Sequence, residues 1–526
     1  MNLTPIEIFG EFEAGYIFKS SLGNRGLFEQ NKINERFFVG DQWYGAKAGA
    51  DRPLVRHNII KRIGDYKMSQ ITNTETRMSF SAEGIPTALE VAPISEFSGI
   101  VTDNEVSGVM AALSDYYDTT CERVNLGALA AEILRNAYIS GTSLLYTYWN
   151  PAISTGTYAD DKKSVEIKGD ISCEILKIED VVFGDPYCEN LQNQPYIIIS
   201  SQKNVADVLR EAEFFGANTT TLQNINDSAT DGKVTLLTKL YKTVKADGTT
   251  LIKGIKVTEN TIVRPEFSTN LSLYPLSQFK WENRSGLAYG DSEITYLIPN
   301  QIAINRMITA NVWAAMSTGL PIMLVNGDTV TEKITNDPGQ IIKIYGSNED
   351  VAGAVNYVTP PCSMSEFDEC INNLINNTLT QSGANEVALG DSRADNATAL
   401  QTLRDAALMP LQLIKNRFYV FLEDTARIWS DFWISHYGKR KLKISKNGIY
   451  TYIPFDADRY KNIIIGAKVD VNKSAFFTEQ EQFSTLLTFF DKGIITKAEL
   501  LERIPKGMIP NIDKINANEV NTDDGI

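Results

Sequence analysis

The chain of 526 residues carries a formal net charge of −15, with 43% hydrophobic and 22% charged residues. This composition is that of an ordinary globular protein of about two to four subdomains, and its apolar runs fall far short of the roughly 18 residues that a membrane span needs. The acidic balance argues against tight binding of nucleic acid, which depends on Lys and Arg displacing counterions. The early acidic residues Glu7, Glu11 and Glu13 predict that no signal peptide is present.

The first 286 residues predict a body of mixed helix and strand. Three helices are expected, over about 58–71, 102–117 and 125–140. A capping box of Thr102 and Glu105 opens the second helix, and Gly141 ends the third. Apolar runs predict strands at 144–149, 171–175 and 196–200, with a short helix at 205–215. Asp247-Gly248 lies between the strand runs 234–244 and 249–257, which indicates a hairpin because type I′ turns need positive φ.

After Gly290 the pattern changes to long helices. Asp291 is expected to cap a helix over 291–317, in which Arg306 is the single basic residue. The other faces of this helix carry Asn300, Gln301, Asn305, Thr309 and Asn311. Helices that are weakly polar with few charges often pack between copies of themselves, and we expect that use here. Short strands follow at 322–325 and 341–345, and a second helix is expected from Ser363 or Ser365 to about Ser382.

The longest predicted element is a helix from about Asp395 to Trp433. Its apolar residues keep a 3.6-residue spacing, and a helix of this length spans on the order of 55 Å. Pro410 removes a backbone hydrogen bond and is expected to kink the helix. The preceding residues, from Ala384, mix Gly, Asn, Asp and Ser and therefore predict a polar loop. The order of helix, small insertion, helix, polar loop and long kinked helix is the most specific architectural signal of the chain.

The last ninety residues predict a second hairpin and a pair of short helices. Asn447-Gly448 joins the strand runs 442–446 and 449–453. Capping boxes of Thr478 with Glu481 and of Thr496 with Glu499 open the helix pair, and an acidic tail follows. For the basic residues of the hairpin, a solvated face is favoured over contact with nucleic acid or an acidic partner. These residues are Lys439, Arg440, Lys441, Lys443 and Lys446.

The sequence carries no signature of catalysis or of cofactor binding. The phosphate-binding GxxxxGK[ST] and GxGxxG patterns and the nucleophile pattern GxSxG are absent. The two histidines, His57 and His436, are isolated and are predicted to be partly exposed structural residues, which leaves little room for a His-based metal site or triad. The five cysteines are scattered without a CxxC pair, and we expect reduced, buried thiols. We therefore predict no enzyme activity, no cofactor and no metal.

Several of these segments carry a family resemblance. They are Asn34 to Trp43, followed by Arg52-Pro53 and Asn58; Tyr289-Gly290-Asp291-Ser292-Glu293 with Asn300, Gln301 and Asn305; Asp395 to Leu403; and Lys468-Val469-Asp470-Val471 with Leu501-Glu502-Arg503-Ile504-Pro505. In this order, over nearly the whole chain, they resemble the portal proteins of tailed bacteriophages and prophages, the head-tail connector family. One departure is Asn396-Ala397-Thr398-Ala399, where the family has a Ser-Gly-x-Ala-like opening of the long helix; it concerns the local turn, because Asn also tolerates positive φ.

The resemblance implies an α+β, mainly helical fold with wing, stem, clip and crown regions, in a cyclic ring of usually twelve subunits. The implied regions are a wing at 1–286, stem helices at 287–318 and 363–383, a clip at 319–362, a tunnel loop at 384–397, a long kinked helix and wing hairpin at 398–474, and crown helices with a tail at 475–526. Twelve subunits of −15 would give roughly −180, a sign that repels phosphate so that DNA slides.

The resemblance also implies which residues face DNA and the packaging partners. The DNA channel would carry Asn385, Glu386, Asp391, Arg393 and Asp395 of the tunnel loop, and Arg306 of the stem. The clip would present Asp328, Glu332, Asp337, Glu349 and Asp350 to the motor or the adaptor. Two alternatives stay open: Arg306 pairs with a carboxylate of a neighbouring subunit while Arg393 is only solvated, and the acidic residues of the clip are ordinary loop charges.

As a portal, the chain is expected at a capsid vertex of the virion, and in the host cytoplasm during assembly. Its expected partners are further copies of itself, the large terminase subunit, a head-tail adaptor, the major capsid protein and, as a further candidate, a scaffolding protein. Double-stranded DNA would pass through the channel without sequence specificity, and no membrane is involved. Two rival functions remain: another connector or minor capsid protein of a virion, and a Mg²⁺-dependent nuclease built on acidic residues.

Overall fold

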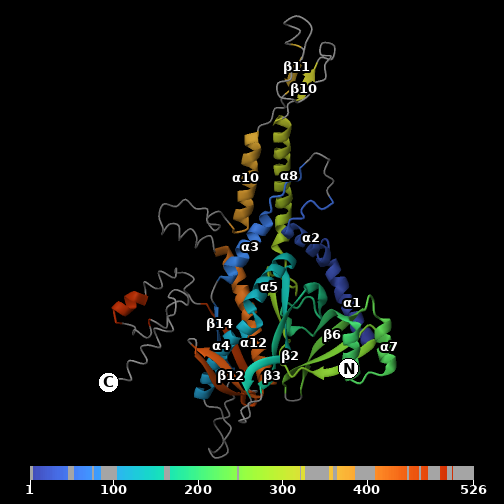
Figure 1. Ribbon diagram of the computed structural model, residues 1–526, viewed down its shortest axis with the longest axis vertical. Helices are drawn as coiled ribbons and strands as arrows, with labels where there is room; N and C mark the ends of the chain where they lie inside the picture. The colour runs from blue at the N-terminus through green and yellow to red at the C-terminus, as the bar shows by residue number, and fades with distance from the viewer. Residues whose placement is uncertain are drawn as a thin grey trace, which may run out of the picture.

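A computed structural model describes most of the chain as a mixture of helix and sheet, with two long helices that project from a larger body (Figure 1). The described residues are 4–45, 53–73, 76–84, 103–158, 166–245, 248–319, 322–325, 353, 355–358, 364–384, 409–446, 449–460, 464–471, 486–493 and 500. The mixed architecture agrees with the predicted α+β class.

Five helices form the N-terminal part of the body. They are α1 (Pro5–Ser21), α2 (Leu27–Val39), α3 (Ile59–Thr72), α4 (Asp103–Val124) and α5 (Leu126–Ser140). The prediction is confirmed within one residue for α3, where Asn58 caps the helix by accepting from the Lys61 amide, and for α5, which ends at Gly141 in a left-handed conformation. The helix expected over 102–117 is longer than predicted, since α4 continues to Val124, and Thr102 lies outside the described residues.

Two antiparallel sheets complete the body. The first has the strand order β3-β2-β9, and the second has the order β4-β5-β6-β7-β8. Their strands are β2 (Thr142–Tyr158), β3 (Glu166–Leu176), β4 (Val181–Phe183), β5 (Tyr196–Asn204), β6 (Lys233–Val244), β7 (Thr250–Thr258), β8 (Thr261–Ser268) and β9 (Leu276–Lys280). Short helices α6 (Val205–Phe214), α7 (Thr219–Asp227), η2 (Ile178–Asp180) and η3 (Leu191–Asn193) lie between them in the sequence. The hairpin predicted around Gly248 is confirmed by the pairing of β6 with β7.

The two projecting helices are α8 (Glu293–Gly319) and α10 (Met364–Gln381), which run side by side away from the body (Figure 1). At their far end β10 (Ile322–Val325) pairs antiparallel with β11 (Val355–Val358). Both helices and the strand at 322–325 were predicted. The strand predicted at 341–345 lies outside the described residues. We call α8 and α10 together the stem.

The C-terminal part returns to the body. After a 3₁₀ turn, η4 (Met409–Leu411), helix α12 (Gln412–His436) leads into β12 (Lys439–Lys446), β13 (Ile449–Asp456), α13 (Ala457–Tyr460) and β14 (Ile464–Val471). The predicted second hairpin is confirmed, since β12 pairs with β13. Strand β14 pairs with β1 (Thr76–Gly84), which the sequence did not predict. Of the helices predicted over 478–504, the structure describes only 486–493 and Leu500.

The described part of the predicted long kinked helix begins at Met409. Pro410 lies in the 3₁₀ turn, and the regular α-helix begins two residues later, at Gln412. Proline is tolerated in the first turn of a helix, where its missing N–H has no intrahelical acceptor. The kink at Pro410 stays a prediction. Residues 385–408, the predicted beginning of the helix, lie outside the described part.

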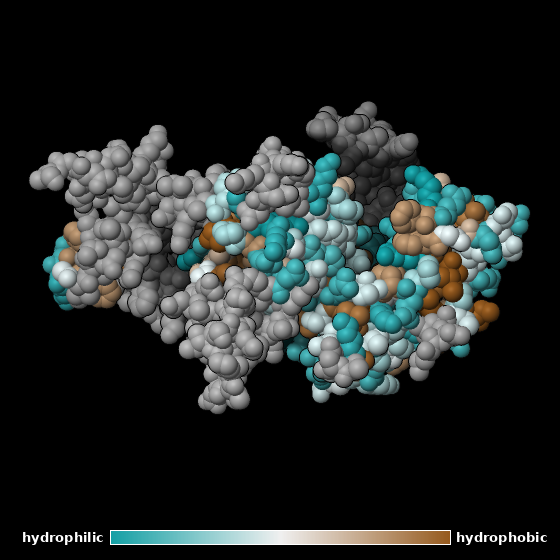
Figure 2. Space-filling view, turned by 90° about the horizontal axis from the view of Figure 1, so that it is seen from below, coloured by the Kyte–Doolittle hydropathy of each residue, from teal (hydrophilic) through white to brown (hydrophobic). Residues whose placement is uncertain are grey.

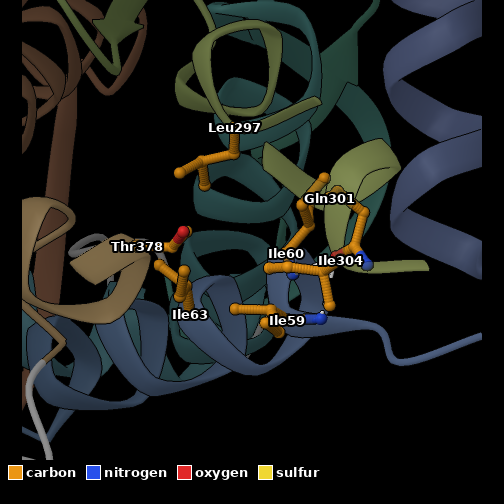
Figure 3. A pocket seen from close by; sticks show the side chains of 7 residues that line it. All are labelled: Ile59, Ile60, Ile63, Leu297, Gln301, Ile304 and Thr378. Atoms are coloured by element: carbon orange, nitrogen blue, oxygen red, sulfur yellow. Dashed lines mark hydrogen bonds between the residues drawn. The ribbon is translucent and has the colours of Figure 1, made fainter. Parts of the chain in front are cut away.

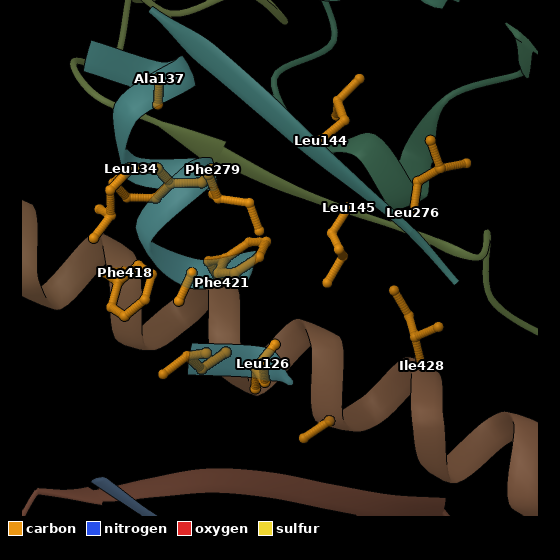
Figure 4. Packing of buried hydrophobic residues seen from close by; sticks show 14 of the residues in the cluster. Leu126, Leu134, Ala137, Leu144, Leu145, Leu276, Phe279, Phe418, Phe421 and Ile428 are labelled. Carbon is orange, nitrogen blue, oxygen red and sulfur yellow. The ribbon is translucent and has the colours of Figure 1, made fainter. Parts of the chain in front are cut away.

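The main hydrophobic core lies where α12 packs against α5 and the three-stranded sheet (Figure 4). Phe279 of β9 meets the rings of Phe418 and Phe421 edge-on, with centroids 5.7 and 6.1 Å apart. Leu134 of α5 and Leu145 of β2 are fully buried in the same cluster. The body is therefore organised around α12, although this helix comes late in the sequence. On the face seen from below, small hydrophobic areas are separated by hydrophilic ones (Figure 2).

Candidate functional site at the stem and its base

The stem begins at a serine cap that joins α8 to the body. The hydroxyl of Ser292 accepts from the Ile294 amide at 3.2 Å and donates to the Tyr138 carbonyl at 2.6 Å. The predicted cap, Asp291, does not fill this role: its carboxylate pairs with Arg284 at 3.6 Å and accepts from the Tyr296 hydroxyl at 3.3 Å. Because Ser292 is 5% exposed and Asp291 is partly exposed, the neutral hydroxyl takes the buried cap position and the charge stays near solvent.

A buried ion pair fixes the first turn of the stem to α3. Lys67 Nζ lies 2.6 Å from Glu293 Oε1, and both side chains are at most 10% exposed. The second carboxylate oxygen of Glu293 accepts from the Trp281 indole at 3.0 Å. Burial and the Glu293 carboxylate raise the pKa of the neighbouring Glu282, and burial lowers the pKa of Arg417, which donates to the Trp281 carbonyl. Helix α3 and the segment after β9 thus bond to the stem's first residue, and α12 joins them through Arg417.

Gln301 holds the start of α3 against the stem. Its carbonyl oxygen accepts from the Ile59 and Ile60 amides at 3.0 and 3.3 Å, and these are two of the donors that a helix leaves without partners at its start. Its amide nitrogen donates to the His57 carbonyl at 2.6 Å and to Asn305 Oδ1 at 3.0 Å. A single buried side chain therefore makes four hydrogen bonds.

Asn305 and Thr309 continue this contact along the same face of α8. Asn305 accepts from the His57 amide at 3.0 Å and donates to Gln42 Oε1 at 2.6 Å. The hydroxyl of Thr309 accepts from the Val55 amide at 3.1 Å. The spacing of four residues places all three side chains on one side of the helix. We name residues 55–60, the segment that these three side chains hold, the strap.

The polar face of α8 is largely occupied by partners from the same chain. Gln301 and Asn305 are 1% and 2% exposed, so both side chains are already buried within one chain. Asn300 donates to Thr378 Oγ1 at 3.2 Å, and Asn311 donates to Asp368 Oδ1 at 2.6 Å, which joins α8 to α10. The packing of α8 between copies stays a prediction.

An apolar junction closes the base of the stem where α3, α8 and α10 meet (Figure 3). The side chains that line it are Ile59, Ile60, Ile63, Leu297, Gln301, Ile304 and Thr378. They leave no room for a water molecule among them. This junction is packing that makes the stem base rigid, and it offers no space to a small ligand.

Of the predicted channel residues, only Arg306 is described. It is exposed on α8, and no ion pair joins it to another described residue. The other predicted channel residues, Asn385, Glu386, Asp391, Arg393 and Asp395, lie outside the described residues. So do the predicted clip residues Asp328, Glu332, Asp337, Glu349 and Asp350.

The basic hairpin is only partly solvated. Arg440 is 4% exposed, with its guanidinium 3.7 Å from the centre of the Tyr437 ring and its Nε donating to the Tyr437 carbonyl at 3.0 Å. The prediction of a solvated face is wrong for this residue, since its planar guanidinium stacks on an aromatic ring in the core. Lys439 is exposed and lies 3.5 Å from Asp456. The side chains of Lys443 and Lys446 lie outside the description.

The histidines and cysteines form no reactive cluster in the described residues. His436 stacks on Trp149 with ring centroids 5.1 Å apart and is partly exposed, which agrees with the predicted structural role, whereas His57 is exposed. The four described cysteines are free, but Cys370 is exposed on α10, against the prediction of buried thiols. No group of three His, Cys, Asp or Glu side chains in the described part is placed to hold a metal ion. None of the described helices is long and apolar enough to cross a membrane.

Sequence reasoning missed the buried ion pair at the stem base. A signal was present, because Lys67 lies on the apolar stripe of α3 that contains Ile60, Ile63 and Ile71. A lysine on such a stripe needs a buried acidic partner, and Glu293 is its partner here. Comparison with known proteins adds no assignment: no protein-family model matches the chain, and no curated protein matches it in sequence.

Proposed function

We propose that the chain is a portal-type subunit. Copies of it form a closed ring at one vertex of a virus capsid, double-stranded DNA is packaged through the ring by a terminase motor, and the DNA later leaves by the same channel. The observation that carries the proposal is the stem: two long antiparallel helices leave an α+β body and end in a small β-pair, the order expected for stem and clip (Figure 1).

The rigid base of the stem supports a mechanical role. The Lys67–Glu293 pair, the strap and the apolar junction connect α8 to two distant parts of the sequence, residues 55–67 and α10. A structure that guides DNA has to hold its stem at a fixed angle to the body, and buried polar contacts with specific partners favour one arrangement. An enzyme has no evident need for a stem fixed in this way.

The net charge supports the same role. A subunit of −15 makes a ring strongly acidic, and an acidic lumen repels phosphate rather than retaining it. Repulsion between subunits opposes assembly, but the screening length is about 8 Å at physiological salt, so only near neighbours contribute. In this proposal the large terminase subunit and a head-tail adaptor dock in turn at the β10–β11 end, while the body contacts the major capsid protein and, during assembly, a scaffolding protein.

The function is tested by imaging the purified full-length chain. Negative-stain microscopy is expected to show rings with a central hole. Native mass spectrometry is expected to give one defined number of subunits per ring, near twelve. A protein that stays monomeric at every salt concentration would contradict the proposal. Nuclease activity with Mg²⁺ or Mn²⁺ that is lost on substitution of one carboxylate would favour the enzyme instead.

A further inference from the structure

Two arginines from distant segments lie in one cluster at the end of the body away from the stem (Figure 1). Arg123 is in the last turn of α4, and Arg440 is the second residue of β12. Tyr437, which follows α12, connects them: its hydroxyl donates to Asp170 Oδ1 at 2.5 Å, and Asp170 forms an ion pair with Arg123. The Arg440 guanidinium lies 3.7 Å from the centre of the Tyr437 ring. Both cations therefore lie around one buried tyrosine.

The charges of this cluster do not balance. Asp170 is fully buried, and its carboxylate is already used by Arg123 and by the Tyr437 hydroxyl. Burial and the nearby Arg123 lower the pKa of Arg440, and no carboxylate of the described residues acts against them. Two cations thus share one carboxylate. Because a buried charge without a partner is strongly unfavourable, the cluster favours the binding of an anion.

Three guanidinium donors of the cluster have no acceptor among the described residues. They are Nε and Nη2 of Arg123 and Nη1 of Arg440, and all three atoms are buried. Nε and Nη2 lie on one side of a guanidinium and point the same way, which is the fork that holds two oxygens of a carboxylate or phosphate. Arg440 is 4% exposed, and its Nε donates to the Tyr437 carbonyl at 3.0 Å. A fork on one arginine and a single donor on the other therefore remain.

A tetrahedral oxyanion fits these donors best. Phosphate has oxygens in several directions, so two can face the fork of Arg123 while a third faces Arg440. A carboxylate has two oxygens in one plane and fills the fork alone. A water molecule can accept hydrogen bonds, but it leaves the excess charge uncompensated. The side chain of Arg123 is 25% exposed, so the cluster borders solvent and an ion can approach from that side.

We propose that this cluster binds one phosphate ion per subunit, held by Nε and Nη2 of Arg123 and by Nη1 of Arg440. The bound ion links the end of α4 to β12, and Asp170 and Tyr437 extend the link to β3 and to the end of α12. Phosphate supplies the missing negative charge and stabilises the folded chain, since the unfolded chain does not hold the two arginines together. The argument uses one chain alone, so the site does not depend on the proposed ring.

Thermal unfolding of the full-length chain with inorganic phosphate tests the site. Sodium phosphate is added at low millimolar concentrations, where its general salting effect is small, and sodium chloride keeps the ionic strength constant. The unfolding midpoint is expected to rise with the logarithm of the phosphate concentration, as binding to the folded state requires. Sulfate should act in the same way, and acetate should act more weakly. Equilibrium dialysis with radiolabelled phosphate is expected to give one bound ion per subunit.

Two variants remove the donors and keep a cation beside Asp170. Arg123→Lys retains the charge of the ion pair but has no fork, and Arg440→Met removes the excess cation while keeping a long side chain. Both variants are expected to lose the bound phosphate in dialysis and the phosphate-dependent rise of the midpoint. Arg210→Lys is the matched control, because Arg210 is exposed on α6 and lies 2.9 Å from Asp207. It should keep both.

Each donor is tested separately, so a variant that does not fold leaves the other to decide. Phosphate that still binds to Arg123→Lys or to Arg440→Met would overturn the donors assigned here, as would acetate that acts as strongly as phosphate. Absence of phosphate binding to the unaltered chain would overturn the site itself. These results leave the proposed function standing, because ring formation is measured independently by microscopy.

Discussion

Removing the ammonium group of Lys67 is expected to destabilise the stem base strongly. Lys67→Met keeps most of the side-chain volume but leaves the Glu293 carboxylate buried with the Trp281 indole as its remaining donor. Loss of one partner from a buried ion pair costs about 3–5 kcal/mol, because the remaining charge stays away from water. We expect a loss of that size in the free energy of unfolding.

The assay is urea unfolding followed by tryptophan fluorescence, at one fixed protein concentration so that assembly does not shift the midpoint. Lys61→Met is the matched control on the same helix, since Lys61 lies 3.4 Å from Asp65 with both side chains about half exposed. An exposed pair of this kind contributes at most about 0.5 kcal/mol. The reasoning would be refuted if Lys67→Met cost no more than Lys61→Met. Adding Glu293→Gln to Lys67→Met should recover stability, because the unpaired charge is then removed.

Three further predictions concern the strap, α1 and the tunnel loop. Gln301→Ala leaves the Ile60 amide buried without an acceptor, while the Ile59 amide keeps the His57 carbonyl at 3.0 Å. At about 1–3 kcal/mol for the unpaired amide, this lowers the urea midpoint clearly; an unchanged midpoint would contradict it. Burial lowers the pKa of Lys19 from 10.5 to about 8, so between these values the folded chain binds fewer protons than the unfolded chain and stability rises with pH. Lys19→Met should make that rise in unfolding midpoints smaller across the same range, while burial also lowers the pKa values of Lys242, Lys280 and Lys415. Shortening the predicted tunnel loop, 384–397, is expected to impair DNA packaging or DNA retention in an assembly assay while the rings still form. Loss of the rings would show that the loop is structural.

Local signals in the sequence were sufficient for most helices and hairpins. The end of α5 at Gly141 and the turn at Gly248 both need a positive φ. Glycine adopts this conformation most readily, so its position in the sequence indicates both features. Strand β1 was missed because its partner, β14, lies almost 400 residues later, and its pairing has no local signal. Pro410 lies in a 3₁₀ turn directly before α12, and proline occurs both at bends and at helix starts, so its residue type alone does not decide between them.

The site residues that were misread share one cause: they are buried, and their local sequence does not show it. Gln301 was expected on a face that packs between copies, and the strap of its own chain lies against it. Arg440 looked solvated, although it lies two residues before the buried Leu442 on β12 and so shares the inward face of the strand with it. Ser292 replaced Asp291 as the cap because the start of α8 is buried, which the sequence of the helix itself does not show. Burial therefore decides polar roles that residue type leaves open.

The central claim is that copies of this chain close into a ring around a channel, with their stems parallel to its axis. Electron microscopy of the purified full-length protein tests it most directly. The account predicts end-on views with a central hole and side views in which a narrow stem projects from a wider body. Particles that are single subunits, or open chains of varying length at every salt concentration, would contradict it.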